Sequence, residues 1–116
     1  MTRVRHWNIR HGGIATGSET PTRIAAEIEA CVYAAWTPDR LIKIGYTTNL
    51  DRRIRGFGSC WTDVLLVVVA DMNFEKAMHA RFKPYVARGA EYYYPVAEIM
   101  SWINDERAVW GVSPAA

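Results

Sequence analysis

Two short apolar runs joined by a turn constrain the fold of this chain more than any other feature. Residues 31–36 and 41–47 are rich in β-branched and aromatic residues, and Thr37-Pro38-Asp39 between them has the residue types of a tight turn. This pattern predicts a β-hairpin. Successive side chains of a strand point to opposite faces. The predicted buried side carries Val32, Ala34, Ile42 and Ile44, and the opposite face carries Tyr33, Lys43, Gly45 and Thr47.

Helices and one further strand are predicted on either side of the hairpin. Thr20-Pro21 is a typical helix start, and we expect a helix from there to about residue 30. Asn49 is a good N-cap for a short arginine-bearing helix that ends near Gly56. The continuous apolar run of residues 64–70 is typical of a strand that is covered on both faces.

The C-terminal third predicts two more helices. Asp71 or Asn73 caps the first, which Gly89 is expected to break, and Pro95 opens the second. Residues 91–94 have the composition of a brief strand between them. The apolar residues expected to face inward are Phe74, Met78, Phe82 and Tyr85 on the first helix, and Val96, Ile99, Met100 and Ile103 on the second.

The composition fits one folded domain. The chain has 116 residues, of which 50% are hydrophobic and 22% are charged, so it can form a core and wholesale disorder is excluded. We expect residues 1–18 to form a flexible basic N-terminal arm and residues 19–116 to form a single domain. The order of elements predicts the α+β class, with a small antiparallel three-stranded sheet flanked by helices.

Arginines gather in two places, although the formal net charge is only +2. One cluster lies in the predicted arm and the other on the short helix. Such clusters can neutralise phosphates and indicate a nucleic-acid partner, but they are also common on solvated surfaces. The candidate nucleic-acid-binding residues are Arg3, Arg5, Arg10, Arg52 and Arg55.

No segment of the sequence indicates secretion or a membrane. The first ten residues lack the apolar stretch of a signal peptide, and the apolar run at residues 64–70 is far shorter than the roughly twenty residues that span a bilayer. Cys31 and Cys60 form no CxxC motif. Two free thiols fit a reducing, cytoplasmic setting.

A tyrosine and a lysine lie at neighbouring positions on the second face of the predicted hairpin. If the Lys43 ammonium is close to Tyr33, it favours the phenolate and lowers the pKa of the phenol. Tyr33 would then serve as a proton acceptor near neutral pH. The alternative is an ordinary cross-strand pair on a solvated face.

The wider pattern resembles the GIY-YIG nuclease superfamily. Val32-Tyr33 and Lys43-Ile44-Gly45 resemble its two hairpin motifs, and Arg53 and Glu75 follow at matching positions. The chain is most similar to the small phage and bacterial branch in which the second motif reads lysine-isoleucine-glycine. The resemblance covers roughly residues 31–94, including the acidic-aromatic run Glu91-Tyr92-Tyr93.

This resemblance implies a metal-dependent endonuclease or nickase acting on DNA. It implies that Tyr33 and Lys43 are catalytic, that Arg53 grips the scissile phosphate, and that Glu75 holds Mg²⁺ or Mn²⁺. A guanidinium can bind two phosphate oxygens at once, and a carboxylate with water ligands suits Mg²⁺. His79 lies one helical turn after Glu75 on the same face, where it either contacts a metal-bound water or the leaving oxygen, or is structural.

Departures from the family pattern keep two other hypotheses open. Cys31 replaces the leading glycine of the first motif, Lys43 replaces a tyrosine, and Phe57 stands where many relatives have a histidine. A catalytically inactive module of the same kind would bind nucleic acid or a protein partner, and a small structural protein would bind neither DNA nor metal. Because one active site cuts one strand, a double-strand break would require a homodimer or two encounters with the DNA.

Overall fold

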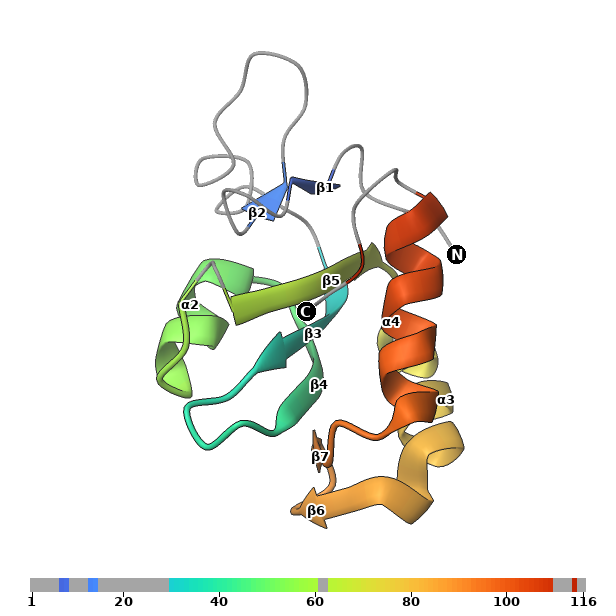
Figure 1. Ribbon diagram of the computed structural model, residues 1–116. Helices are drawn as coiled ribbons and strands as arrows, with labels where there is room; N and C mark the ends of the chain where they lie inside the picture. The colour runs from blue at the N-terminus through green and yellow to red at the C-terminus, as the bar shows by residue number, and fades with distance from the viewer. Residues whose placement is uncertain (1–6, 9–12, 15–29, 61–62, 110–113, 115–116) are drawn as a thin grey trace.

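Five antiparallel strands form one sheet at the centre of the protein. The computed structural model describes residues 7–8, 13–14, 30–60, 63–109 and 114. The strand order is β5-β3-β4-β7-β6, and every neighbouring pair is antiparallel (Figure 1). The strand bounds are β3 Cys31–Trp36, β4 Ile42–Thr47, β5 Val64–Val69, β6 Val86–Arg88 and β7 Tyr92–Tyr93. The α+β class is therefore as predicted, but the expectation of a three-stranded sheet is wrong.

Helices cover both faces of the sheet. In Figure 1, α3 and α4 lie together on one side, and α2 lies on the other side with the sheet between them. The bounds are α2 Leu50–Gly56, α3 Met72–Phe82 and α4 Ala97–Val109, with a 3₁₀ turn, η3, at Lys83–Tyr85. A separate two-stranded antiparallel ladder pairs β1, Trp7–Asn8, with β2, Gly13–Ile14.

The predicted hairpin is confirmed. Strands β3 and β4 pair along their whole length, with Trp36 opposite Ile42 and Cys31 opposite Thr47. Between them, the backbone N–H of Thr37 donates to the carbonyl of Leu41 at 2.9 Å, and the chain turns through Arg40 at φ 65°. The hairpin residues predicted to face the core all lie in it: Val32, Ala34, Ile42 and Ile44.

The other face of the hairpin is buried as well, so the alternative of a solvated face is wrong. Tyr33 is fully buried and Lys43 is only 4% exposed. Leu50 and Ile54 of α2 are fully buried too, and the ring of Phe57 at the end of α2 stacks parallel to that of Tyr33. A polar face of this kind can be buried because α2 and its C-terminal residues supply the covering layer.

Strand β6 arises where the sequence predicted a longer helix, whereas β7 lies within residues 91–94, which were expected to form a brief strand. Helix α3 ends at Phe82, and the next three residues form a 3₁₀ turn that includes Pro84. Since proline has no backbone N–H to donate, it favours this early end. The prediction that Gly89 breaks the helix is wrong. Gly89 has φ +56° and lies in the turn between β6 and β7, a backbone conformation that glycine adopts without strain.

The remaining predicted elements in the described residues are confirmed. Asp71 caps α3 by accepting from the backbone N–H groups of Asn73 and Phe74, and Asn49 caps α2 by accepting from that of Arg52. The inward-facing residues of both long helices pack in or against the core. The predicted helix from Thr20 and most of the basic arm lie outside the described residues. Within the described part of the chain, no helix is long and apolar enough to span a membrane.

Candidate active site

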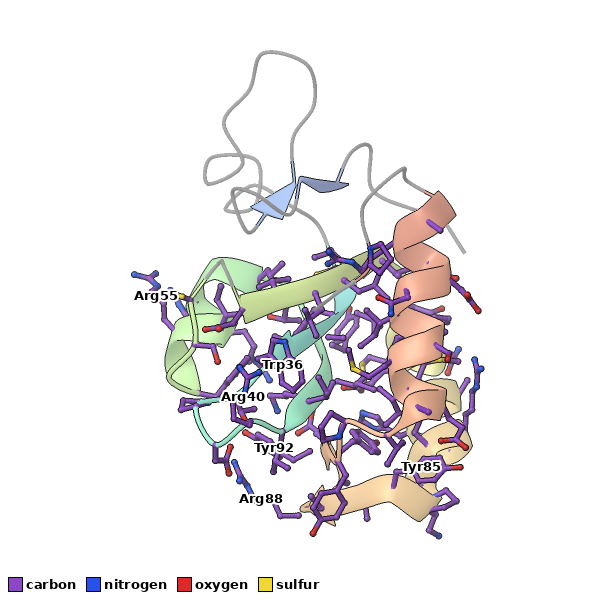
Figure 2. All side chains as sticks on the ribbon, in the orientation of Figure 1. Trp36, Arg40, Arg55, Tyr85, Arg88 and Tyr92 are labelled. Atoms are coloured by element: carbon purple, nitrogen blue, oxygen red, sulfur yellow. The ribbon has the colours of Figure 1, made fainter. Side chains whose placement is uncertain are left out.

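An open pocket of about 370 Å³ lies between the end of α2 and the strands β4 and β7. Its lining combines cations with aromatic rings: Lys43, Arg52, Arg53, Gly56, Phe57 and Tyr92. Figure 2 shows Tyr92 next to Arg88, whose guanidinium lies over the Tyr92 ring. A pocket with three cationic side chains is suited to an anion such as a phosphodiester.

Lys43 is held tightly at the base of this pocket. Its Nζ lies 3.5 Å from Oε2 of Glu91 and 4.4 Å from the centre of the Tyr92 ring, with the Phe57 ring at 5.6 Å. An ammonium group that is almost completely buried needs such partners, since desolvation penalises an isolated charge. Its cross-strand partner is Ala35, so Lys43 lies diagonally from Tyr33 and not directly opposite.

Tyr33 lies opposite Gly45, and the two fit closely. A Cβ atom built on Gly45 would lie 2.7 Å from the phenol oxygen of Tyr33. The Tyr33 ring stacks on Phe57 with centres 6.0 Å apart. Its hydroxyl has no hydrogen-bond partner among the described residues, although it is fully buried. Buried hydroxyls normally find a partner, so this phenol keeps a donor that no described protein group uses, although Tyr33 itself does not line the pocket.

The expected effect of Lys43 on the Tyr33 phenol is wrong. Burial raises the pKa of Tyr33 well above its usual value. The positive charge of Arg53 opposes this increase, the negative charge of Glu91 adds to it, and burial dominates. Tyr33 is therefore a neutral phenol at physiological pH and not a ready proton acceptor.

The arginines of α2 divide between the pocket and the surface. Arg52 and Arg53 line the pocket, as a phosphate-binding role requires. Arg55 is exposed on α2 and is not part of the pocket lining (Figure 2). The other predicted nucleic-acid-binding residues, Arg3, Arg5 and Arg10, lie outside the described residues.

Glu75 and His79 project from α3 to the edge of β4. Strand β7 pairs with only the first part of β4, so the backbone groups farther along this edge need other partners. The backbone N–H of Tyr46 donates to Oε2 of Glu75 at 2.8 Å, and Nε2 of His79 donates to the carbonyl of Ile44 at 2.9 Å. The two side chains thus bond backbone groups of β4 beyond the reach of β7. Their predicted positions on one helical face are confirmed.

Glu91 connects the two groups of residues. One ligand atom each from Glu75, His79 and Glu91 lie within 4.8 Å of one another. Glu91 also pairs with Lys43, which lines the cationic pocket. The sequence predicts no role for Glu91 beyond its place in the acidic-aromatic run Glu91-Tyr92-Tyr93. The pairing of Lys43 with Tyr92 across β4 and β7 brings Glu91 to the site.

A second ion pair fixes the strand that carries Tyr92. Arg88 of β6 pairs with Asp39 in the β3–β4 turn, and its guanidinium lies 4.3 Å from the centre of the Tyr92 ring. Hydrogen bonds from Thr37 and Arg88 hold the pKa of Asp39 below its usual value. The ion pair therefore ties β6 to the β3–β4 turn beside the pocket, which keeps the Tyr92 ring against Lys43.

The fold and site define a small α+β protein with a cationic pocket beside a cluster of carboxylates and a histidine. The T5orf172 domain family matches residues 30–106, about two thirds of the chain and the whole of this site, and the chain belongs to that family. Neither a curated protein nor a solved structure matches the chain significantly.

Proposed function

We propose that this protein is a metal-dependent endonuclease or nickase that hydrolyses phosphodiester bonds of DNA. The observation that carries the proposal is the direct contact between the cationic pocket and the cluster of Glu75, His79 and Glu91. Lys43 lines the cationic pocket and pairs at 3.5 Å with Glu91, which adjoins Glu75 and His79. An anionic substrate needs positively charged side chains around it, and a divalent cation needs negatively charged ones. This arrangement places both kinds side by side.

The cationic half supports phosphate binding. In this proposal, Arg53 donates to two non-bridging oxygens of the scissile phosphate, and Lys43 and Arg52 add positive charge around it. Tyr33 lies behind the pocket lining and acts as a neutral hydrogen-bond donor through a water molecule, since its hydroxyl is buried without a partner among the described residues. Preorganised donors of this kind stabilise the charge that develops on a phosphate in the transition state.

The acidic half supports a divalent metal. One oxygen of Glu75 is fixed by the backbone N–H of Tyr46, so the carboxylate is oriented and keeps lone pairs for a cation. Mg²⁺ or Mn²⁺ is the proposed cofactor, and Glu75 is the residue that would hold it. A bound divalent ion supplies positive charge at the phosphate and lowers the pKa of a water ligand.

Membership of the T5orf172 domain family, which is phage-associated, supports a DNA-related role for the chain. The alternative is a catalytically inactive module of the GIY-YIG type that binds nucleic acid or a protein partner. Both hypotheses use the cationic pocket, so DNA binding alone does not separate them.

Parallel binding and cleavage measurements separate the two hypotheses. A 5′-labelled DNA duplex is mixed with the full chain in Mn²⁺, in Mg²⁺ and in EDTA. Fluorescence anisotropy follows binding, and a denaturing gel follows strand cleavage. The proposal predicts binding in all three conditions and cleavage only with metal. Binding that is never followed by cleavage favours the inactive module.

A further inference from the structure

Three side chains from separate parts of the chain meet beside the cationic pocket. Glu75 and His79 come from α3, and Glu91 comes from the turn before β7. One oxygen or ring nitrogen of each lies within 4.8 Å of the other two. Nε2 of His79 lies 4.0 Å from Oε2 of Glu75, so a cation would bind all three side chains once the imidazole presents a nitrogen lone pair to it.

The backbone of β4 already orients two of these side chains. The carbonyl of Ile44 can only accept, so Nε2 of His79, at 2.9 Å, carries the proton of this hydrogen bond. The lone pair of the neutral ring is then on Nδ1. Glu75 is fixed in the same way by the N–H of Tyr46 at 2.8 Å. Metal-binding histidines and carboxylates typically have such outer hydrogen bonds, which set the tautomer and the orientation.

Glu91 brings a second carboxylate close to that of Glu75. Two carboxylates at this distance repel each other unless a positive charge lies nearby. Lys43 supplies such a charge on the side of the pocket, where its Nζ is 3.5 Å from Glu91. A divalent cation between the carboxylates would supply it on the side of Glu75 and His79. The Glu91 side chain is 36% exposed, so it can adjust to an incoming ion.

We propose that Glu75, His79 and Glu91 together form the divalent-metal site, and that this site prefers Mn²⁺ or Zn²⁺ to Mg²⁺. The preference follows from the imidazole, which suits transition metals, whereas Mg²⁺ takes oxygen ligands and gives up its water reluctantly. The biological purpose of the site rests on the proposed nuclease function. Metal binding itself can be measured without cleavage.

Binding of Mn²⁺ to the full chain, measured by electron paramagnetic resonance of the free ion, tests the ligand set. We expect one Mn²⁺ per chain in the wild type. Glu91→Gln should weaken binding by about tenfold or more, because it removes one charged ligand. The matched control is Glu98→Gln, which alters an exposed glutamate in the first turn of α4 that is not part of the cluster. It should bind Mn²⁺ as the wild type does.

Competition with Mg²⁺ tests the role of the histidine. His79→Gln keeps an N–H donor for the Ile44 carbonyl but removes the imidazole ligand. The preference for Mn²⁺ over Mg²⁺ should then fall by about tenfold or more, while urea unfolding confirms that the variant folds. If His79→Gln does not fold, the Glu91→Gln measurement still decides the ligand set.

Two results would overturn the proposal: wild-type Mn²⁺ affinity in Glu91→Gln, or equal affinities of the wild type for Mn²⁺ and Mg²⁺. These results leave the nuclease proposal standing if the protein still cleaves DNA through Glu75. Conversely, the expected Mn²⁺ binding together with an absence of cleavage supports the metal site and contradicts the nuclease function.

Discussion

Substituting Gly45 with alanine should destabilise the protein, because the methyl group has no room. A Cβ at this position would lie 2.7 Å from the phenol oxygen of Tyr33, 3.0 Å from its Cζ and 3.1 Å from its Cε1. The Tyr33 ring cannot easily move away, since it is fully buried and stacks on Phe57. The glycine of the lysine-isoleucine-glycine motif is therefore required by packing.

The expected magnitude follows from two opposing effects. Overpacking a well-filled core costs about 1–3 kcal/mol. Replacing glycine also restricts the unfolded chain, which stabilises the folded state by about 0.4–1 kcal/mol. We expect Gly45→Ala to lower the free energy of unfolding by about 1–2 kcal/mol, with the overpacking cost larger than the entropic gain.

Urea unfolding of the full chain measures this difference, provided that the m-value is unchanged. Gly56→Ala is the matched control, because a Cβ there meets nothing within 4 Å. It lies at the end of α2, where alanine should increase stability by up to about 1 kcal/mol. A Gly45→Ala variant as stable as the wild type would refute the packing argument.

The Tyr33→Phe background identifies the atom responsible. That change removes the phenol oxygen, which is the atom closest to the new methyl group. The cost of Gly45→Ala should therefore be smaller in Tyr33→Phe than in the wild type, giving a measurable coupling in a double-mutant cycle. An equal cost in both backgrounds would place the strain elsewhere.

Three further predictions concern the proposed activity. Arg53→Lys keeps the charge but loses the two-pronged contact with phosphate, so the cleavage rate should fall by about two orders of magnitude; an unchanged rate would make Arg53 a mere surface charge. Because burial raises the pKa of Tyr33, Lys43→Met should lower the cleavage rate by the same factor at every pH. A shift of the basic limb of the pH–rate profile would contradict a neutral Tyr33 phenol. Deleting residues 1–18, with their three arginines, should weaken DNA affinity and flatten its dependence on salt, because fewer counterions are released; binding titrations at several salt concentrations with an unaltered slope would exclude the arm from the interface.

The hairpin and its two faces could be predicted from the sequence, because a period of two is a local property of a strand. Asn49 could be predicted as a helix cap for the same reason, and Asp71 as one of two candidates with Asn73, since capping acts within a few residues. The burial of Tyr33 could not be predicted in this way. It depends on α2 and Phe57 folding back over the hairpin, which is a tertiary contact.

The sheet and the acidic half of the site show the same limit. Strands β6 and β7 are three and two residues long, too short for a periodic pattern, and only composition indicated a strand at residues 91–94. Glu91 reaches Glu75 and His79 only because β7 pairs with β4. Side chains brought together by strand pairing carry no common spacing in the sequence, so this cluster became visible only in the structure.

Cleavage of supercoiled plasmid by the wild type and by Glu75→Gln tests the nuclease proposal most directly. Glutamine can still accept the hydrogen bond from the Tyr46 N–H and is well tolerated in a helix, so the fold should be retained. With Mg²⁺ or Mn²⁺, the wild type and the Glu98→Gln control should nick the plasmid, whereas Glu75→Gln, or the wild type in EDTA, should leave it supercoiled. Nicking by Glu75→Gln at the wild-type rate, or no nicking by the wild type with either metal, would contradict the proposal.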